Sequence, residues 1–210
     1  MIVYANRESG HSYKVVATLV LAGAPHEIRT VDLDVPRQDR RADFLAVSPY
    51  GEVPVLVDGE TVLAQSNAIL VYLARKLGVF GGESEARLAL VTQWLFWEAN
   101  RVGISVPNLR HLKRSGGAAP AVFDWLRARA VADLGRLDRE LADRRFVLGE
   151  TPTVVDVACS AYLWFPADQA ELELAPWPNV ERWLDAIRAL PGWRHPYDAI
   201  PGHVVGGHPG

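Results

Sequence analysis

Residues 49–73, PYGEVPVLVDGETVLAQSNAILVYL, carry the clearest structural signals in this 210-residue chain. Residues 53–57 are apolar and mostly β-branched, which is typical of a buried strand. Asp58 and Gly59 form a turn that tolerates positive φ, so residues 60–64 should fold back antiparallel. Ser66 is a good N-cap, and apolar residues at helical spacing follow it. The stretch therefore predicts a strand, a turn, a second strand and a helix.

Two polar features of this stretch indicate a binding site. Pro54 stands at the head of a strand, where proline is unfavourable unless the backbone leaves the ladder for another partner. A cis Val53–Pro54 bond would turn the Val53 N–H and C=O outward, toward an extended peptide. The helix start at Ser66 offers N–H groups and a positive dipole end, which suit a carboxylate. The alternative is an edge-strand proline beside an ordinary helix cap.

The chain before this stretch alternates strands and helices. We expect a strand at residues 2–5, a helix at 11–22 that Gly23 ends, and a strand at 26–33. A short helix through Phe44 should end before Pro49. With residues 53–73, the order β-α-β-α-β-β-α is that of a thioredoxin-like domain.

Residues beyond the stretch predict helices only. Long apolar periodicities cover residues 85–113, with a bend near Pro107, and residues 121–144. Thr153 and Asp156 form a capping box that opens a helix through Cys159 and Trp164, and a last helix covers residues 179–190. We predict a first domain at 1–78, a linker at 79–84, a helical domain at 85–194 and a Gly/Pro/His-rich tail at 195–210. The tail is either a disordered end or a flap over the active site.

The composition narrows the class of protein. Apolar residues make up 49% and charged residues 22%, as in ordinary globular domains. The net charge of −3, without runs of like charge, argues against nucleic acid and anionic membranes as partners. The single cysteine, Cys159, excludes an intrachain disulfide and a CxxC pair. The sequence contains no signal peptide or membrane span by these criteria, so we expect a cytoplasmic protein.

The Val-Pro strand, the hairpin and the Gln65-Ser66-Asn67 helix start together resemble the glutathione-binding half of the cytosolic glutathione transferases, and of their bacterial, serine-type members in particular. The resemblance extends over nearly the whole chain, since residues 146–156 are similar to the family's capping-box signature, whose role is folding. It implies an α+β protein with a thioredoxin-like domain followed by an all-α domain. In this family the Val-Pro strand pairs with the cysteine of glutathione and the Gln-Ser pair holds its γ-glutamyl carboxylate. The resemblance thus assigns glutathione binding to Val53, Pro54, Gln65 and Ser66.

The loop after the first strand is where the family lowers the pKa of the glutathione thiol. Counting back from Gly23, the family's tyrosine position falls on Ala5 and its serine position on Ser9. Ser9 precedes the expected helix, so its hydroxyl and the N–H groups of Gly10 and His11 could stabilise one thiolate. The alternative is a loop serine that bonds its own backbone.

Two neighbours of Ser9 are further catalytic candidates. The segment SGHSYKV, residues 9–15, resembles an SGNCYKV segment of bacterial relatives, with His11 in place of Asn and Ser12 in place of Cys. His11 could hydrogen-bond the thiolate or face solvent, and Ser12 could act on the thiol or serve as a plain N-cap.

The remaining site residues also come from the resemblance. The glycine end of glutathione would meet Arg37, Gln38 or Arg40, unless this loop is simply solvated. Gly10 and Glu52 complete the predicted glutathione-binding residues, although the acidic side chain of Glu52 should face away from an anionic ligand. An apolar electrophile would lie near the long helices. Its candidate residues there, which could equally be core, are Trp97, Asn100, Asn108 and His111. No histidine pair has metal-ligand spacing, so we expect no metal.

The predicted function is a homodimeric glutathione transferase whose co-substrate is glutathione and whose second substrate is a small apolar electrophile. Alternatives are a glutathione-dependent peroxidase, isomerase or dehalogenase, and a non-catalytic glutathione-binding protein. A salt bridge from Asn6-Arg7-Glu8 that filled the site would favour the non-catalytic protein. A thiol–disulfide enzyme with a cysteine in the first loop is excluded, because the loop has none.

Overall fold

The computed structural model describes residues 1–202 of the 210. The chain forms two compact units: unit 1 combines residues 1–73 with the C-terminal segment from Pro191, and unit 2 is residues 74–190. The predicted tail therefore belongs, in its described part, to the same unit as the N-terminal sheet. Of the tail predicted at 195–210, the described part contains an ordered helix at 196–199, and residues 203–210 lie outside the described residues.

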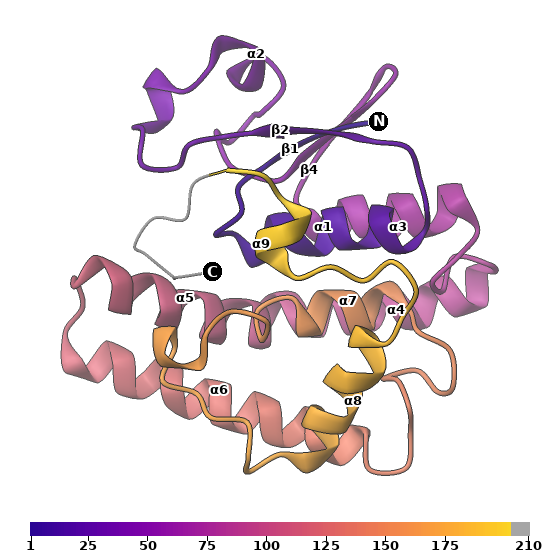
Figure 1. The fold of residues 1–210 in the computed structure, drawn as a ribbon, viewed down its shortest axis with the longest axis vertical. Helices are drawn as coiled ribbons and strands as arrows, with labels where there is room; N and C mark the ends of the chain where they lie inside the picture. The colour runs from indigo at the N-terminus through magenta and orange to yellow at the C-terminus, as the bar shows by residue number, and fades with distance from the viewer. Residues whose placement is uncertain (203–210) are drawn as a thin grey trace. The chain divides into compact units, whose positions relative to one another are not determined.

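Unit 1 contains a mixed four-stranded sheet. The strands are β1 (Ile2–Ala5), β2 (Glu27–Thr30), β3 (Val55–Asp58) and β4 (Thr61–Ala64), in the order β2-β1-β3-β4 (Figure 1). β1 pairs with β2 in parallel, while β3 is antiparallel to both β1 and β4. The predicted hairpin is confirmed, but Asp58 is the last residue of β3 and Gly59, with φ of 60°, starts the turn. The strand also begins two residues later than predicted, so Val53 and Pro54 precede the ladder.

Helices cover both faces of this sheet (Figure 1). α1 (Gly10–Leu21) and α3 (Ser66–Leu77) lie on one face, where Val16 and Leu70 are inaccessible to solvent. On the other face Tyr4 packs against Phe44 of α2 (Ala42–Leu45), with ring centroids 5.6 Å apart. A 3-10 turn, η1 (Arg37–Asp39), precedes α2, and α9 (Pro196–Ala199) is a short helix that we did not expect. Unit 1 is therefore a thioredoxin-like domain.

Unit 2 is helical. Its elements are α4 (Glu85–Asn100), α5 (Val102–Ser115), α6 (Pro120–Glu140), α7 (Val154–Ser160), the 3-10 turn η2 (Ala167–Gln169) and α8 (Pro178–Arg188). The single long helix predicted at 85–113 is wrong, because it breaks at Arg101 into α4 and α5, and Pro107 lies inside α5. The break brings Gly103 against Glu98, where an added Cβ would stand 2.5 Å from the carboxylate. α7 ends before Trp164, and α6 ends four residues before its predicted end at residue 144.

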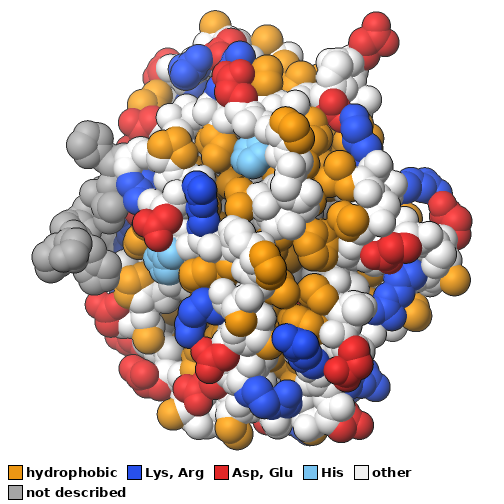
Figure 2. Space-filling view, turned by 45° about the vertical axis from the view of Figure 1, so that its right-hand side comes forward, with side chains coloured by type: hydrophobic (Ala, Val, Ile, Leu, Met, Phe, Trp, Pro, Cys, Tyr) orange, Lys and Arg blue, Asp and Glu red, His pale blue; other side chains and the backbone are white. Residues whose placement is uncertain are grey.

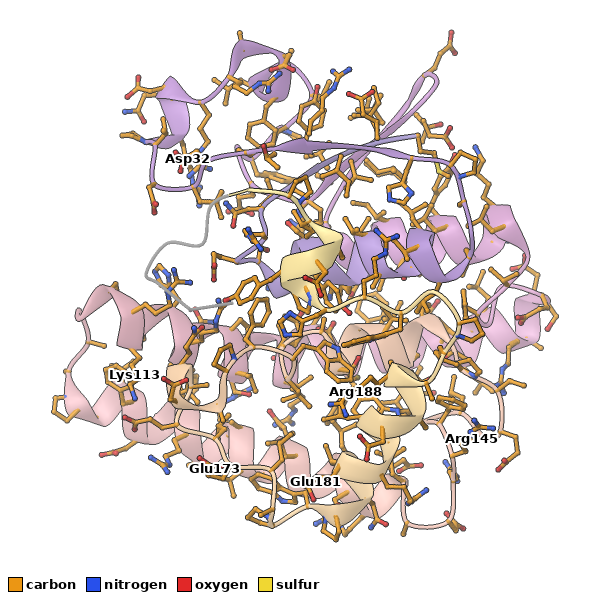
Figure 3. All side chains as sticks on the ribbon, viewed as in Figure 1. Asp32, Lys113, Arg145, Glu173, Glu181 and Arg188 are labelled. Carbon is orange, nitrogen blue, oxygen red and sulfur yellow. The ribbon has the colours of Figure 1, made fainter. Side chains whose placement is uncertain are left out.

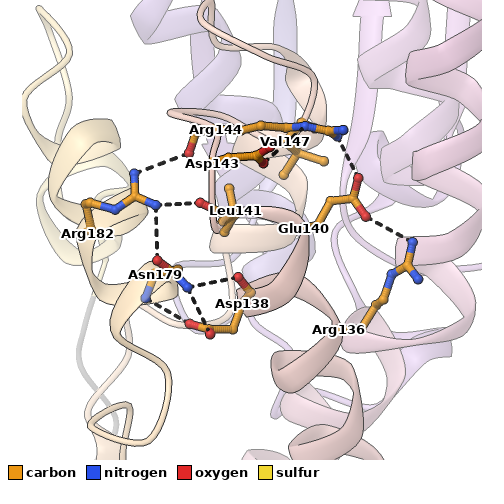
Figure 4. A network of polar contacts seen from close by, with 9 residues as sticks. All are labelled: Arg136, Asp138, Glu140, Leu141, Asp143, Arg144, Val147, Asn179 and Arg182. Carbon is orange, nitrogen blue, oxygen red and sulfur yellow. Dashed lines mark hydrogen bonds and ion pairs between the residues drawn. The ribbon is translucent and has the colours of Figure 1, made fainter.

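Polar contacts join α6 to α8 (Figure 4). The Asp138 carboxylate accepts hydrogen bonds from the N–H of Asn179, at 2.8 Å, and of Val180, at 3.2 Å, at the start of α8. Arg182 donates to the Leu141 carbonyl across 2.5 Å at the end of α6. A carboxylate at a helix N-terminus satisfies N–H groups that have no helical acceptor. These bonds fix the two helices to each other.

The surface carries charges of both signs. On the face in Figure 2, Lys and Arg alternate with Asp and Glu around apolar areas. Lys113, at the end of α5, lies 2.6 Å from Glu171, and Arg188 of α8 stacks over the Trp164 ring at 5.6 Å (Figure 3). Within residues 1–202, no helix is both long and apolar enough to cross a membrane.

Candidate functional site

A pocket of about 120 Å³ lies in unit 1, at the ends of two helices. Its lining residues are His11, Tyr50, Glu52, Val53, Pro54, Ala64, Gln65 and Ser66. Six of these are predicted site residues, drawn from three separate parts of the sequence. Tyr50 and Ala64 were not predicted, because neither belongs to the Val-Pro and Gln-Ser motifs that carry the resemblance. A volume this small accommodates part of an extended ligand, since drug-sized sites measure roughly 300–1,000 Å³.

Ser9 is the N-cap of α1. Its side-chain oxygen accepts the Ser12 N–H at 3.2 Å, and its carbonyl accepts the Tyr13 N–H at 2.9 Å. The Gly10 N–H, at the first helical position, has no acceptor within the helix. In the described part of the chain the structure records no acceptor for the Ser9 hydroxyl proton. Ser9 thus adds a hydroxyl donor to the positive end of α1, although it is not among the lining residues of the pocket.

Ser12 and His11 have different surroundings. Ser12 is fully buried, and its hydroxyl oxygen accepts the Asn6 N–H at 3.1 Å. The interpretation of Ser12 as the N-cap is wrong, because Ser9 occupies that position. Its burial makes Ser12 a support for the loop before α1. His11, half-buried in the first turn of α1, lines the pocket.

The segment before β3 forms the opposite wall of the pocket. The Val53–Pro54 peptide bond is cis, and Pro54 is buried. Both residues line the pocket and lie outside the strand ladder.

The start of α3 has an unusual backbone conformation. Gln65 has φ of 71°, in the left-handed region that non-glycine residues rarely adopt. Its carbonyl accepts the Ile69 N–H at 3.1 Å, so Gln65 is the cap and Ser66 the first helical residue. The predicted N-cap at Ser66 is therefore one residue too late. Such a conformation costs roughly 1–3 kcal/mol and is concentrated at functional sites.

The predicted basic contacts have other partners. Arg37 forms an exposed ion pair with Glu52, with Nη2 and Oε1 3.0 Å apart. Glu52 lines the pocket, and its carboxylate is the partner of Arg37 in this ion pair. Arg40 donates to three carbonyls, of Leu33 at 3.1 Å, Val35 at 3.0 Å and Gly51 at 2.5 Å. Its guanidinium is thus committed to the loop.

The Asn6-Arg7-Glu8 segment does not fill the pocket. Asn6 donates to the Val31 carbonyl at 2.9 Å and accepts the Glu8 N–H at 2.8 Å. Arg7 donates to the carbonyl of Tyr197 at 2.5 Å, and the Tyr197 hydroxyl donates to Glu8 at 3.2 Å. These contacts join Arg7 and Glu8 to Tyr197, and none of the three residues of the segment lines the pocket.

The four predicted electrophile residues lie on α4 and α5 in unit 2. Trp97 packs edge-on against Trp94, with ring centroids 5.2 Å apart. The Asn100 carbonyl accepts a bond from Arg129 at 2.6 Å, and Asn108 donates to the Ile104 carbonyl at 2.8 Å. His111 is exposed. A pocket of about 40 Å³ in this unit is lined by other residues, among them Arg110, whose guanidinium stacks over Phe165 at 3.7 Å.

Metal-ligating side chains do not gather anywhere in residues 1–202: no group of three or more His, Cys, Asp or Glu could hold an ion there.

Comparison with known proteins identifies the family. Residues 1–75 match the model described as Glutathione S-transferase, N-terminal domain, and residues 110–186 match Glutathione S-transferase, C-terminal domain. A curated relative from Escherichia coli is 30% identical over 203 residues, which cover 90% of each chain. This chain belongs to the glutathione S-transferase family. Its resemblance and its predicted fold class are thereby confirmed.

The relatives within the glutathione S-transferase family have different names. The E. coli relative is named "Disulfide-bond oxidoreductase YfcG". "Glutathione S-transferase 3" of Zea mays is 30% identical over 212 residues, which cover 95% of this chain and 94% of that protein. A crystal structure of a glutathione S-transferase from Pseudomonas fluorescens superposes with a TM-score of 0.84 at 29% identity, covering 94% of this chain and 98% of that one. Membership of the family implies a glutathione site. Because the relatives are named for different reactions, the family alone does not identify the reaction of this chain.

Proposed function

We propose that the chain binds glutathione in the pocket between His11, Pro54 and Ser66 and stabilises its thiolate for attack on an apolar electrophile. The observation that supports this proposal is the pocket itself. Residues that the family resemblance assigns to glutathione, from three parts of the sequence, line one pocket beside the N-termini of α1 and α3.

Binding would use the two ends of the pocket. The γ-glutamyl carboxylate would accept hydrogen bonds from Ser66 and the first turn of α3, where the helix dipole favours an anion. Val53, which takes no part in the β3 ladder, would pair with the cysteinyl backbone as an added strand does. Arg37 balances the charge of Glu52 at the rim.

The chemical step would use the N-terminus of α1. The Ser9 hydroxyl and the Gly10 N–H would donate to the sulfur, so the thiol loses its proton to solvent at lower pH. The thiolate then forms a bond to the electrophilic carbon, and the leaving group departs with the electron pair. Each unit by which the pKa falls corresponds to about 1.4 kcal/mol of thiolate stabilisation.

The test is the pH dependence of thiolate absorbance of bound glutathione. The wild type should bind with a thiol pKa well below that of free glutathione, and Ser9→Ala should return most of the shift. Ser115→Ala is the matched control, because the Ser115 hydroxyl only bonds the Leu112 carbonyl at the end of α5. If the thiol pKa is lowered equally in wild type and Ser9→Ala, the thiolate is stabilised by His11 and the backbone N–H groups instead of Ser9. Binding without any shift would contradict the proposal.

A second candidate is glutathione-dependent reduction of a disulfide, which the name of the E. coli relative favours. The glutathione thiolate would attack one sulfur of the disulfide, form a mixed disulfide and release the other half as a thiolate. A second glutathione would then attack the glutathione sulfur of the mixed disulfide, giving oxidised glutathione and the second thiol. No protein thiol takes part, and Cys159 is fully buried.

The two reactions are separable by their products. With bis(2-hydroxyethyl) disulfide, reduction would yield one oxidised glutathione for each disulfide consumed. With 1-chloro-2,4-dinitrobenzene, transfer would yield a thioether and chloride, and no oxidised glutathione. The ratio of the two kcat/KM values identifies the preferred chemistry. Activity with neither reagent, together with glutathione binding, would support the non-catalytic alternative.

We also propose the homodimer that the family resemblance implies. Phe96 of α4, a large apolar side chain that is 75% exposed, is one that a partner subunit would cover. Sedimentation equilibrium would report a mass twice that of the chain. The cytoplasmic location stays a prediction.

A further inference from the structure

The C-terminal segment follows α1 along its length. Gly192 lies beside the end of α1, where an added Cβ would stand 3.6 Å from the Val20 carbonyl. Further along, the buried Tyr13 hydroxyl donates to the Arg194 carbonyl across 2.7 Å. α9 then lies alongside α1 in unit 1 (Figure 1). The segment therefore runs from the C-terminal end of α1 toward its N-terminal end.

Arg7 binds this segment where it reaches the N-terminal end of α1. One terminal nitrogen of Arg7 donates to the Tyr197 carbonyl at 2.5 Å and the other to the Gly202 carbonyl. The guanidinium carbon lies 5.1 Å from the centre of the Tyr197 ring, and the Tyr197 hydroxyl donates to Glu8 across 3.2 Å. Arg7 and Glu8, near the N-terminus of the chain, thus both bind Tyr197, near its C-terminus.

The other side of the same loop is held by Asn6. The Asn6 side chain bonds the Val31 carbonyl and the Glu8 N–H, and its own N–H donates to Ser12. Ser12 in turn donates its N–H to Ser9. The loop of residues 6–9 is therefore fixed from the sheet by Asn6 and from the C-terminal segment by Arg7 and Glu8.

We propose that Arg7 and Tyr197 are positioning residues for Ser9, so that the C-terminal segment is part of the thiolate site although it does not line the pocket. The inference rests on the proposed function. A hydroxyl donor stabilises a developing charge best when its place is fixed before the charge forms. Loops otherwise move on fast timescales, and ordering one costs entropy. We call the contacts of Arg7 and Glu8 with Tyr197 the clamp. The clamp restricts the motion of residues 7 and 8, which directly precede the N-cap Ser9.

The test compares Arg7→Met with Arg41→Met. Arg41 is an exposed arginine of the same unit whose recorded partner is the neighbouring Asp43, which makes it a matched control. Arg7→Met should raise the pKa of the bound glutathione thiol by about one unit, a tenfold smaller thiolate fraction at low pH. Hydrogen exchange at the Ser12 amide, which reports the Ser9 cap, should be about tenfold faster. Binding of S-methylglutathione, which has no thiol, should change less than twofold.

Tyr197→Phe is a milder variant that keeps the ring under Arg7 and removes the hydroxyl bond to Glu8. It should change the thiol pKa and the Ser12 amide exchange in the same direction but by less. It replaces Arg7→Met in the test if that variant fails to fold. If both variants match Arg41→Met in thiol pKa and in Ser12 exchange, the proposal is overturned. If wild type itself shows no thiol shift, the proposed function fails, and Ser12 exchange alone then decides whether the clamp orders the loop.

Discussion

The Trp183 indole N–H donates to the Asp156 carboxylate across 2.9 Å, and neither side chain is accessible to solvent. The same carboxylate accepts the N–H of Val147 at 2.8 Å and of Thr153 at 2.7 Å. One buried aspartate therefore connects the capping box of α7, the 146–149 turn and α8. Both oxygens of the Asp156 carboxylate are hydrogen-bond acceptors, and each accepts at least one of these N–H groups.

Asp156→Asn should destabilise the protein although it preserves size. An amide offers one acceptor oxygen where the carboxylate offers two, so at least one buried N–H loses its partner, at roughly 1–3 kcal/mol each. We expect the free energy of unfolding in urea to fall by about 3 kcal/mol. Asp143→Asn, whose side chain is 88% exposed, should leave it unchanged. Equal stability of the two variants would contradict a structural role for this carboxylate.

Replacing Gln65 with glycine should make the protein more stable but weaken its binding of glutathione. Glycine adopts a φ of 71° without strain, so Gln65→Gly should raise the free energy of unfolding by up to about 1 kcal/mol. The same change removes the amide from the pocket and should weaken glutathione binding, measured by calorimetry. Glu171→Gly relieves a similar conformation, with φ of 52°, in unit 2 and should leave binding unaltered. Unchanged binding in Gln65→Gly would remove the side chain from the site.

Glu52→Gln should strengthen glutathione binding. The change removes a negative charge from the pocket wall and leaves Arg37 without its ion-pair partner, and glutathione is an anion. Because both groups are exposed, we expect a gain of about threefold at low salt that disappears as salt is added. Glu60→Gln, in the β3–β4 turn, is the control. Weaker binding at every salt concentration would mean that Glu52 contacts a cationic part of the ligand.

Stability should depend on pH through Asp133. Burial raises the pKa of the Asp133 carboxyl above its usual range, against the opposing hydrogen bond from Ser105 and the charges of Arg101 and Arg129. The folded state then keeps its proton to higher pH than the unfolded state. Folding takes up a proton in that window, so stability falls as pH rises above about 4.

Asp133→Asn removes this titration. The wild type should lose stability relative to the variant as pH rises from about 4 toward neutrality, measured by urea unfolding at several pH values. Asp124→Asn, an exposed position on the same helix, should instead follow the wild-type curve. A constant difference between wild type and Asp133→Asn across the range would contradict the prediction.

Local signals explain what the sequence predicts well. Gly59 and the apolar residues on both sides of the turn specify the β3–β4 hairpin, although the turn lies one residue later than the sequence predicts, and the Thr153–Asp156 spacing specifies the cap of α7. The pocket residues Val53, Pro54, Gln65 and Ser66 come from one contiguous motif. The hairpin and the cap each depend on residues within a few positions of one another, and the four pocket residues lie within the single stretch 49–73.

Features that depend on distant residues could not be predicted. Arg40 resembles a ligand contact in sequence, but the path of its loop brings three carbonyls to its guanidinium. The long helix breaks at Arg101, where Gly103 lies close to Glu98, and not at the proline that follows. Arg7 and Tyr197 are 190 positions apart, and neither carries a local signal of their contact.

Cys159, the only cysteine in the chain, is completely enclosed in α7. Disulfides exchange with any thiolate that they can reach. Because the Cys159 sulfur is inaccessible, we expect the folded chain to form no mixed disulfide with oxidised glutathione. The same feature makes any cysteine introduced at the surface a unique attachment point for a spectroscopic label.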